Sequence, residues 1–214
     1  MKETLAVEKF IKVSNNLSLD FINTKIAESG VPKDLLENFT DLAAWTIAVG
    51  LLEKSKAEKL IDEWKDSAEI TGAFARTIKF REVLREMFVN MSRGKAVGKA
   101  AIAAINAEIQ NQSGWIEIKK TENGFEKLFR ADLREPSQLL APVAESAADL
   151  LCYGNPSYLK KCESDDCVLY FYDTTKNHTR RWCSMAACGN RAKAAAHYRR
   201  AREAKQTSGK SKSK

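Results

Sequence analysis

The sequence predicts a mainly α-helical chain of the α+β class. A helical N-terminal domain with a small β-hairpin is followed by a small cysteine-rich C-terminal unit. Three observations predict this organisation. Apolar residues recur at helical spacing through most of residues 18–153. Residues 115–129 instead alternate apolar and polar residues on either side of an Asn-Gly turn. Four of the five cysteines lie between positions 162 and 188.

The elements of the N-terminal domain follow from capping residues and periodicity. Residues 5–13 are predicted as a short strand, and residues 115–119 and 125–129 as the two strands of the hairpin. Helices are predicted over residues 18–26, 40–49, 55–64, 71–93, 99–110 and 136–153. Gly154-Asn155-Pro156 ends the last helix, so we place a domain boundary there. The predicted units are a helical domain over 1–155, a finger over 156–204 and a disordered basic tail over 205–214.

The four clustered cysteines form two pairs with metal-ligand spacing. Cys162 and Cys167 are separated by four residues, as are Cys183 and Cys188, and fifteen residues lie between the pairs. Such pairs supply the four soft ligands that zinc takes in a tetrahedron. Disulfides are disfavoured because the N-terminus lacks the pattern of a secretory signal. Four thiolates leave no position for a catalytic water, so we predict one structural Zn²⁺.

The residues around the cysteines predict how this unit folds. Val168–Tyr172 is a β-prone run, residues 173–178 are rich in turn formers, and Ser184 can cap an Ala- and Arg-rich helix reaching about residue 204. This order of cysteine turn, β-hairpin, cysteine turn and helix resembles a treble-clef zinc finger. The fifth cysteine, Cys152, is predicted to be a small core residue. His178 and His197 are predicted to be surface or packing residues.

The same stretch resembles the CGNR zinc finger, through Cys188-Gly189-Asn190-Arg191. The likeness extends upstream through Lys161-Cys162, Cys167, Phe171, Asp173, Asn177 and Arg180-Arg181-Trp182. The N-terminal part resembles the ABATE domain, through Leu19-Asp20-Phe21-Ile22-Asn23-Thr24 and through Ala141–Leu151. The resemblance implies a bacterial transcription regulator, described as stress-induced, with a DNA-binding finger.

Charge is distributed unevenly along the chain. The net charge is +7, yet residues 156–214 contain 14 Lys or Arg against 5 Asp or Glu, whereas the remainder carries a net charge of −2. The positive excess therefore lies in the finger and tail, which is typical of a polyanion-binding module attached to a neutral domain. A solubilising tail would account for the last ten residues, but not for the charge inside the finger.

The zinc core leaves a set of basic residues without a role, and we predict that they bind nucleic acid. They are Arg180, Arg181, Arg191, Lys193, Arg199, Arg200, Arg202 and Lys205. On a helix, Arg191, Ala195, Arg199 and Arg202 share one face, where guanidinium groups can reach phosphates or a major groove. For Asn190 and Arg191 a structural role beside the zinc loop is equally favoured.

A second candidate site lies in the helical domain. Asn23, Thr24, Arg81 and Arg85 could form a pocket for a small anionic effector. The favoured alternative is that Asn23 and Thr24 satisfy backbone groups in the core and that the arginines lie on a solvated helix face.

These features favour a DNA-binding regulator with an N-terminal domain for sensing or homodimerisation. An RNA- or ribosome-associated zinc protein and a protein-interaction module remain as alternatives. An enzyme is disfavoured, because the sequence contains no catalytic Cys–His or Ser–His–Asp grouping and no phosphate loop. No apolar run is long enough to cross a membrane, so we expect a cytoplasmic protein that does not interact with membranes.

Overall fold

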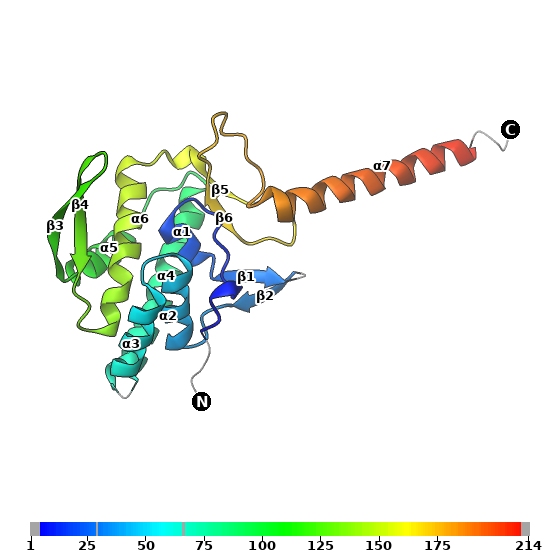
Figure 1. Ribbon diagram of the computed structural model, residues 1–214. Coiled ribbons are helices and arrows are strands. Elements are labelled where there is room, and N and C mark those ends of the chain that lie inside the picture. Colours follow the sequence, from blue (N-terminus) through cyan, green and yellow to red (C-terminus); the bar gives the residue numbers. More distant parts are fainter. Residues whose placement is uncertain (1–4, 29, 66, 211–214) are drawn as a thin grey trace.

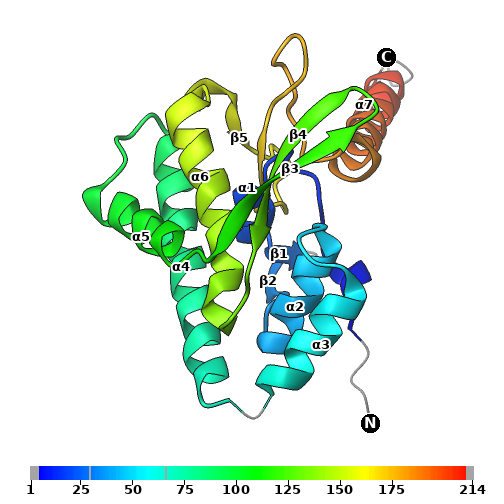
Figure 2. The same ribbon diagram turned by 60° about the vertical axis from the view of Figure 1, so that its left-hand side comes forward.

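The structure is a computed structural model that describes residues 5–28, 30–65 and 67–210, with the backbone alone for 203–210 (Figures 1 and 2). The helices are α1 (Leu17–Ile22), α2 (Phe39–Ala48), α3 (Lys54–Trp64), α4 (Glu69–Met91), α5 (Lys99–Gln110), α6 (Ala141–Tyr153) and α7 (Asn190–Lys210). The strands form three separate antiparallel pairs: β1 (Lys25–Glu28) with β2 (Val31–Asp34), β3 (Gly114–Thr121) with β4 (Gly124–Ala131), and β5 (Leu159–Lys161) with β6 (Tyr170–Tyr172). None of the helices in these ranges is both long and apolar enough to span a bilayer.

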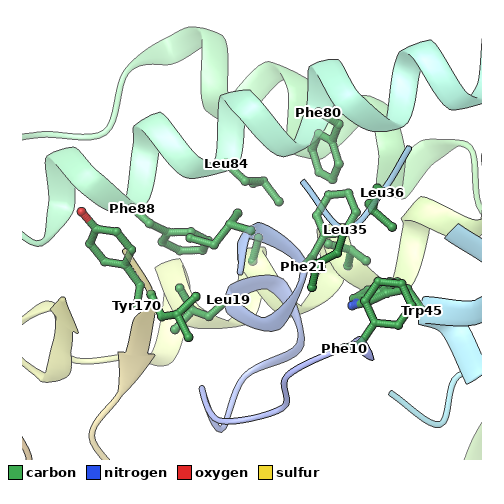
Figure 3. Packing of buried hydrophobic residues seen from close by; sticks show 14 of the residues in the cluster. Phe10, Leu19, Phe21, Leu35, Leu36, Trp45, Phe80, Leu84, Phe88 and Tyr170 are labelled. Carbon is green, nitrogen blue, oxygen red and sulfur yellow. The ribbon is translucent and has the colours of Figure 1, made fainter. Parts of the chain in front are cut away.

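The core is built around the short helix α1, which lies against α4 and α6. Its residues Leu19, Phe21 and Ile22 have no solvent-exposed surface. Figure 3 shows Leu19 and Phe21 facing Leu84 and Phe88 of α4. A helix of only six residues is not stable alone, so α1 depends on this burial. Its first turn is fixed by Asn16, whose side chain accepts a hydrogen bond from the Leu19 N–H.

Most predicted helices are confirmed, but the N-terminal region differs from the prediction. Residues 5–13 contain a 3-10 turn at Val7–Lys9 and no strand. The helix predicted over 18–26 ends at Ile22, and Lys25–Glu28 instead pairs with Val31–Asp34 through a turn at Gly30. Gly30 has a φ of +82°, a left-handed backbone conformation that glycine adopts readily in a hairpin turn.

Asn23 ends α1 because its side chain binds another part of the chain. Its Nδ2 donates to the Tyr170 carbonyl at 2.7 Å, and its Oδ1 accepts from the Tyr170 N–H at 2.9 Å. The side chain is 1% exposed. It therefore continues the hydrogen-bonding pattern of β6 as a neighbouring strand would, and it joins the helical domain to the C-terminal unit.

The C-terminal unit shares the core of the helical domain. Leu159, Leu169, Tyr170 and Phe171 are buried in the same apolar cluster as α1 and α4. Figure 3 places Tyr170 beside Phe88. The helix α7 projects away from the body, as Figures 1 and 2 show. It continues to Lys210, so residues 205–210 of the predicted tail are helical, and 211–214 lie outside the described residues.

Replacing Asn23 should destabilise the whole chain. Asn23→Ala leaves the buried N–H and C=O of Tyr170 without partners, at a cost of about 2–4 kcal/mol. Urea unfolding followed by tryptophan fluorescence would measure it. Asn123→Ala, in the exposed β3–β4 turn, is the matched control and should leave the midpoint unchanged. Equal midpoints for both variants would show that the Asn23 link contributes nothing to stability.

Candidate metal centre and nucleic-acid interface

Four cysteine side chains meet at the base of α7. Cys162 follows β5, Cys167 precedes β6, and Cys183 and Cys188 lie just before α7. All four are buried, and their Sγ atoms lie within 4.8 Å of one another. The Sγ of Cys183 is 3.8 Å from that of Cys167 and 3.5 Å from that of Cys188. These are the four residues that the sequence pairs predict.

This arrangement fits one zinc ion. A tetrahedron with Zn–S bonds of about 2.3 Å has sulfur–sulfur edges of roughly 3.8 Å, close to the two distances above. Four thiolate donors favour zinc over harder cations, and they fill its coordination sphere. The chain is therefore able to hold one zinc ion in a closed site of the structural type.

The thiols alone cannot all ionise. Hydrogen bonds from Cys167 and Cys183 hold the pKa of Cys162 far below its usual range. The hydrogen bond with Cys162 raises the pKa of Cys167 to about 11. The pKa of Cys183 is raised further, by its hydrogen bonds with Cys162 and Cys167. Four thiolates at this separation need a bound cation to offset their repulsion.

The start of α7 complements the negative charge of such a centre. Zn²⁺ with four thiolates has a net charge of −2, and positive groups surround the sulfur of Cys188. The Arg191 Nη2 lies 3.1 Å from this sulfur, which raises the pKa of Arg191. The N-terminal end of α7 adds its partial positive charge. Arg191 therefore has the structural role that the sequence left open.

A single π-helical turn, Met185–Gly189, carries Cys188 into the cluster. Ser184 precedes this turn as predicted, although its side chain makes no capping hydrogen bond. Gly189 is buried, and a Cβ there would lie 2.7 Å from the Met185 sulfur. The amide of Asn190 donates to the Ala186 carbonyl at 3.3 Å, which ties the turn to the first residue of α7.

The prediction of a β-hairpin between the two cysteine pairs is wrong. The strand β6 lies there as predicted, but its partner is β5, which precedes Cys162. The hairpin therefore encloses the first cysteine pair, and the Cys162 N–H donates to the Leu169 carbonyl at 2.9 Å. Residues 173–182 form a loop and not a returning strand.

The loop after β6 is held by Asp173, which is fully buried. It accepts hydrogen bonds from the Lys160 Nζ at 2.7 Å, the Thr175 hydroxyl at 2.6 Å and the Arg180 N–H at 2.9 Å. Burial alone raises the pKa of this carboxyl, but the hydrogen bonds outweigh it and hold the pKa well below its usual range. The ring of His178 stacks on Tyr158 at 3.6 Å, in the packing role predicted for it.

Arg180 is predicted to bind nucleic acid, but its guanidinium group contacts other parts of the protein. The group lies over the Phe171 ring, 4.2 Å from its centroid. Its nitrogens donate to the carbonyls of Trp182 at 3.0 Å, Val13 at 2.7 Å and Cys183. Arg180 thus ties the N-terminal segment to the zinc loop. Arg181, by contrast, is exposed and pairs with Glu163 at 2.6 Å.

The basic residues further along α7 are exposed to solvent. Lys193, Arg199, Arg200 and Arg202 have no hydrogen bond or ion pair with any other side chain that the structure describes. The side chain of Lys205 lies outside the described residues. Beside the start of α7 is a surface cavity of about 550 Å³. Its lining includes Lys176, Asn177, Thr179, Arg181, Trp182 and Met185.

Sequence reasoning did not assign Lys176 and Thr179 to a site. Both lie in the loop after β6, where the amino-acid composition predicts a turn but does not indicate which side chains lie together. What places them beside Arg181 is the course of the loop around Asp173.

The four residues of the predicted effector pocket all bind other parts of the chain. Asn23 holds Tyr170, and Thr24 donates to the Phe21 carbonyl at 2.8 Å. The expectation of a solvated face is wrong for Arg81, which has no exposed surface and forms a bidentate pair with Asp34. Although burial raises the pKa of Asp34, this pairing lowers it below the ordinary value. Arg85 donates to the Ile22 carbonyl at 3.2 Å.

Cys152 is not the core residue that the sequence predicts. It lies on α6 but is exposed. The buried face of this helix is formed by Val143, Ala144, Ala147 and Leu150, and Cys152 points away from it. An apolar helix with many alanines does not distinguish its two faces clearly, which explains the error.

Comparison with protein-family models identifies two regions in the order that the sequence predicts. Residues 15–154 match the ABATE model, described as "Putative stress-induced transcription regulator". Residues 158–201 match the CGNR zinc finger model. No curated protein matches the chain.

Each purified chain should contain one zinc ion that depends on the four clustered cysteines. Cys167→Ser should abolish stoichiometric zinc, whereas Cys152→Ser, outside the cluster, should retain it. Elemental analysis gives the stoichiometry, and cobalt substitution gives the bands of a tetrahedral tetrathiolate site. A parent protein without zinc, or equal loss in both variants, would contradict the assignment.

Asp173 should stabilise the folded chain at neutral pH. Asp173→Asn leaves the half-buried Lys160 without its counter-charge, so we expect a loss of about 2 kcal/mol. Because the folded pKa is lowered, this contribution is complete above the ordinary carboxyl pKa of about 4 and is lost as pH falls below it. Denaturant unfolding of parent and variant from pH 7 down to pH 3, with zinc retention monitored, measures the difference. A difference that grows as pH falls would contradict this role.

Proposed function

Because the chain belongs to the ABATE family and carries a CGNR zinc finger, we propose that it is a transcription regulator that binds duplex DNA through α7 and the adjoining loop. The observation that carries the proposal is the exposure of Lys193, Arg199, Arg200 and Arg202 on a helix that leaves the body. The helical domain then serves sensing or self-association.

The dimensions and composition of α7 suit a DNA groove. An α-helix with its side chains is about 10–12 Å wide, and the major groove is about 12 Å wide. Ala195 lies between Arg191 and Arg199 on one face, so the backbone can approach the base edges closely. Lys193 and Arg200 lie about half a turn around the helix axis from this face, where their long side chains can reach phosphates.

The loop beside α7 extends this basic surface. Lys176 and Arg181 line the cavity at the start of the helix together with the indole of Trp182. Backbone amides and short polar groups such as Thr179 are common phosphate ligands. Arg180 and Arg191 are not assigned to DNA contacts, because their guanidinium groups already bind the zinc loop.

Binding should fall steeply with salt, because several phosphates displace counterions. If four or five phosphates are engaged, log K should decrease with log[salt] at a slope of roughly −4. Arg199→Ala with Arg202→Ala should make this slope about 2 units shallower and leave the zinc content unchanged. Fluorescence anisotropy with a labelled duplex across a salt series measures both.

The matched control removes the same number of positive charges from another part of the chain. Lys56→Ala with Lys95→Ala removes two exposed lysines of the helical domain and should retain the parent slope. Equal affinity of the α7 double variant and the parent would exclude these arginines from the interface. Stronger binding to single-stranded RNA than to duplex DNA would favour an RNA-associated protein, and a flat salt response would favour a protein partner.

A further inference from the structure

The β3–β4 hairpin exposes large apolar side chains. Ile116 is 58% exposed, Ile118 72%, Phe125 79% and Phe129 44%. The strand register pairs Ile116 with Phe129, Ile118 with Lys127 and Lys120 with Phe125. Directly opposed residues of an antiparallel pair share a face, so all four apolar side chains lie on the same face of the hairpin. We call it the hairpin face.

An exposed face of this kind needs a partner. A two-stranded hairpin is marginally stable alone in water, and its two outer edges are unpaired in the described part of the chain. Contiguous apolar patches on monomers are commonly interaction sites. The opposite side of the same hairpin carries an ordinary surface ion pair between Glu117 and Arg130. Four of the five large exposed apolar side chains of the hairpin therefore share the hairpin face, and the fifth, Trp115, lies on the other face with Glu117.

The hairpin face continues into a groove against α6. A cavity of about 610 Å³ is lined there by Ile116, Lys127 and Phe129 of the hairpin and by Glu145 of α6, among others. Neither Lys127 nor Glu145 has an ion-pair partner among the described residues. The groove thus combines an apolar floor with one free charge of each sign.

We propose that the hairpin face is a homodimer interface, on which a second copy of this chain seats its own hairpin about a two-fold axis. A patch with both signs of charge can complement itself, because Lys127 of each copy can meet Glu145 of the other. The inference does not depend on DNA binding by α7.

The available area also fits a second copy. A large side chain presents on the order of 200 Å² when fully exposed, so the four residues offer about 500 Å² of apolar surface per copy. A stable interface needs roughly 800 Å² per partner. The stems of Lys120 and Lys127 and the adjoining edge of α6 can supply the remainder.

Sedimentation velocity of the full zinc-loaded chain across a concentration series tests the proposal. The parent should sediment as a species of twice the 23.9 kDa chain mass at micromolar concentrations. Ile118→Lys with Phe125→Lys should weaken dimerisation at least about tenfold, because each exposed side chain loses its burial in the interface. Both positions are largely exposed in the monomer, so folding and zinc content should be retained.

The matched control is Val31→Lys, which changes an exposed apolar residue of the β1–β2 hairpin and should dimerise like the parent. A charge exchange adds a second readout. Lys127→Glu should weaken the dimer, and adding Glu145→Lys should restore it. A parent that stays monomeric at hundreds of micromolar, or a hairpin variant that dimerises as the parent does, would overturn the proposal and leave the face to a different protein. Duplex binding measured on the same variants separates this outcome from a failure of the DNA-binding proposal.

Discussion

The C-terminal unit depends on one electrostatic constraint: four buried cysteine sulfurs lie within 4.8 Å of one another. As thiolates they repel strongly, and a dication removes only half of their charge. The remaining charge explains the start of α7. A cation in the first turn of a helix normally opposes the helix dipole, but Arg191 sits there beside the Cys188 sulfur. The π-helical turn before it brings that sulfur into the cluster, so α7 begins where the metal centre fixes it.

The finger is not an independent module, because polar and apolar contacts tie it to the helical domain. Asn23 replaces a missing strand beside β6, and Arg180 joins Val13 to the zinc loop. Tyr170 and Phe171 extend the core of α1 and α4. Some 45 residues cannot build a sufficient core alone, and this finger gains one both from zinc and from its neighbour. A shift of α1 would therefore change the position from which α7 projects.

The sequence was sufficient for the features that depend on local spacing. The zinc ligands, the α5 helix at Lys99–Gln110 and the β3–β4 hairpin follow from paired cysteines, periodicity and an Asn-Gly turn. The features that it could not provide depend on distant contacts. Asn23 ends α1 only because Tyr170 lies beside it, and β6 pairs with β5 across a turn that the cysteines close. Arg180 resembles its exposed neighbour Arg181 in sequence, and only the fold places it over Phe171.

The charge distribution favours the helical domain over the finger as the site of the proposed self-association. Residues 156–214 carry a net charge of +9, so two fingers brought together would repel each other at ordinary salt. The helical domain is nearly neutral and carries the hairpin face, where no such repulsion opposes contact. In Figure 1 the hairpin and α7 lie on opposite sides of the body. Pairing through the hairpin therefore leaves both α7 helices uncovered, and a polyanion that binds one copy does not compete with the second copy for the same surface.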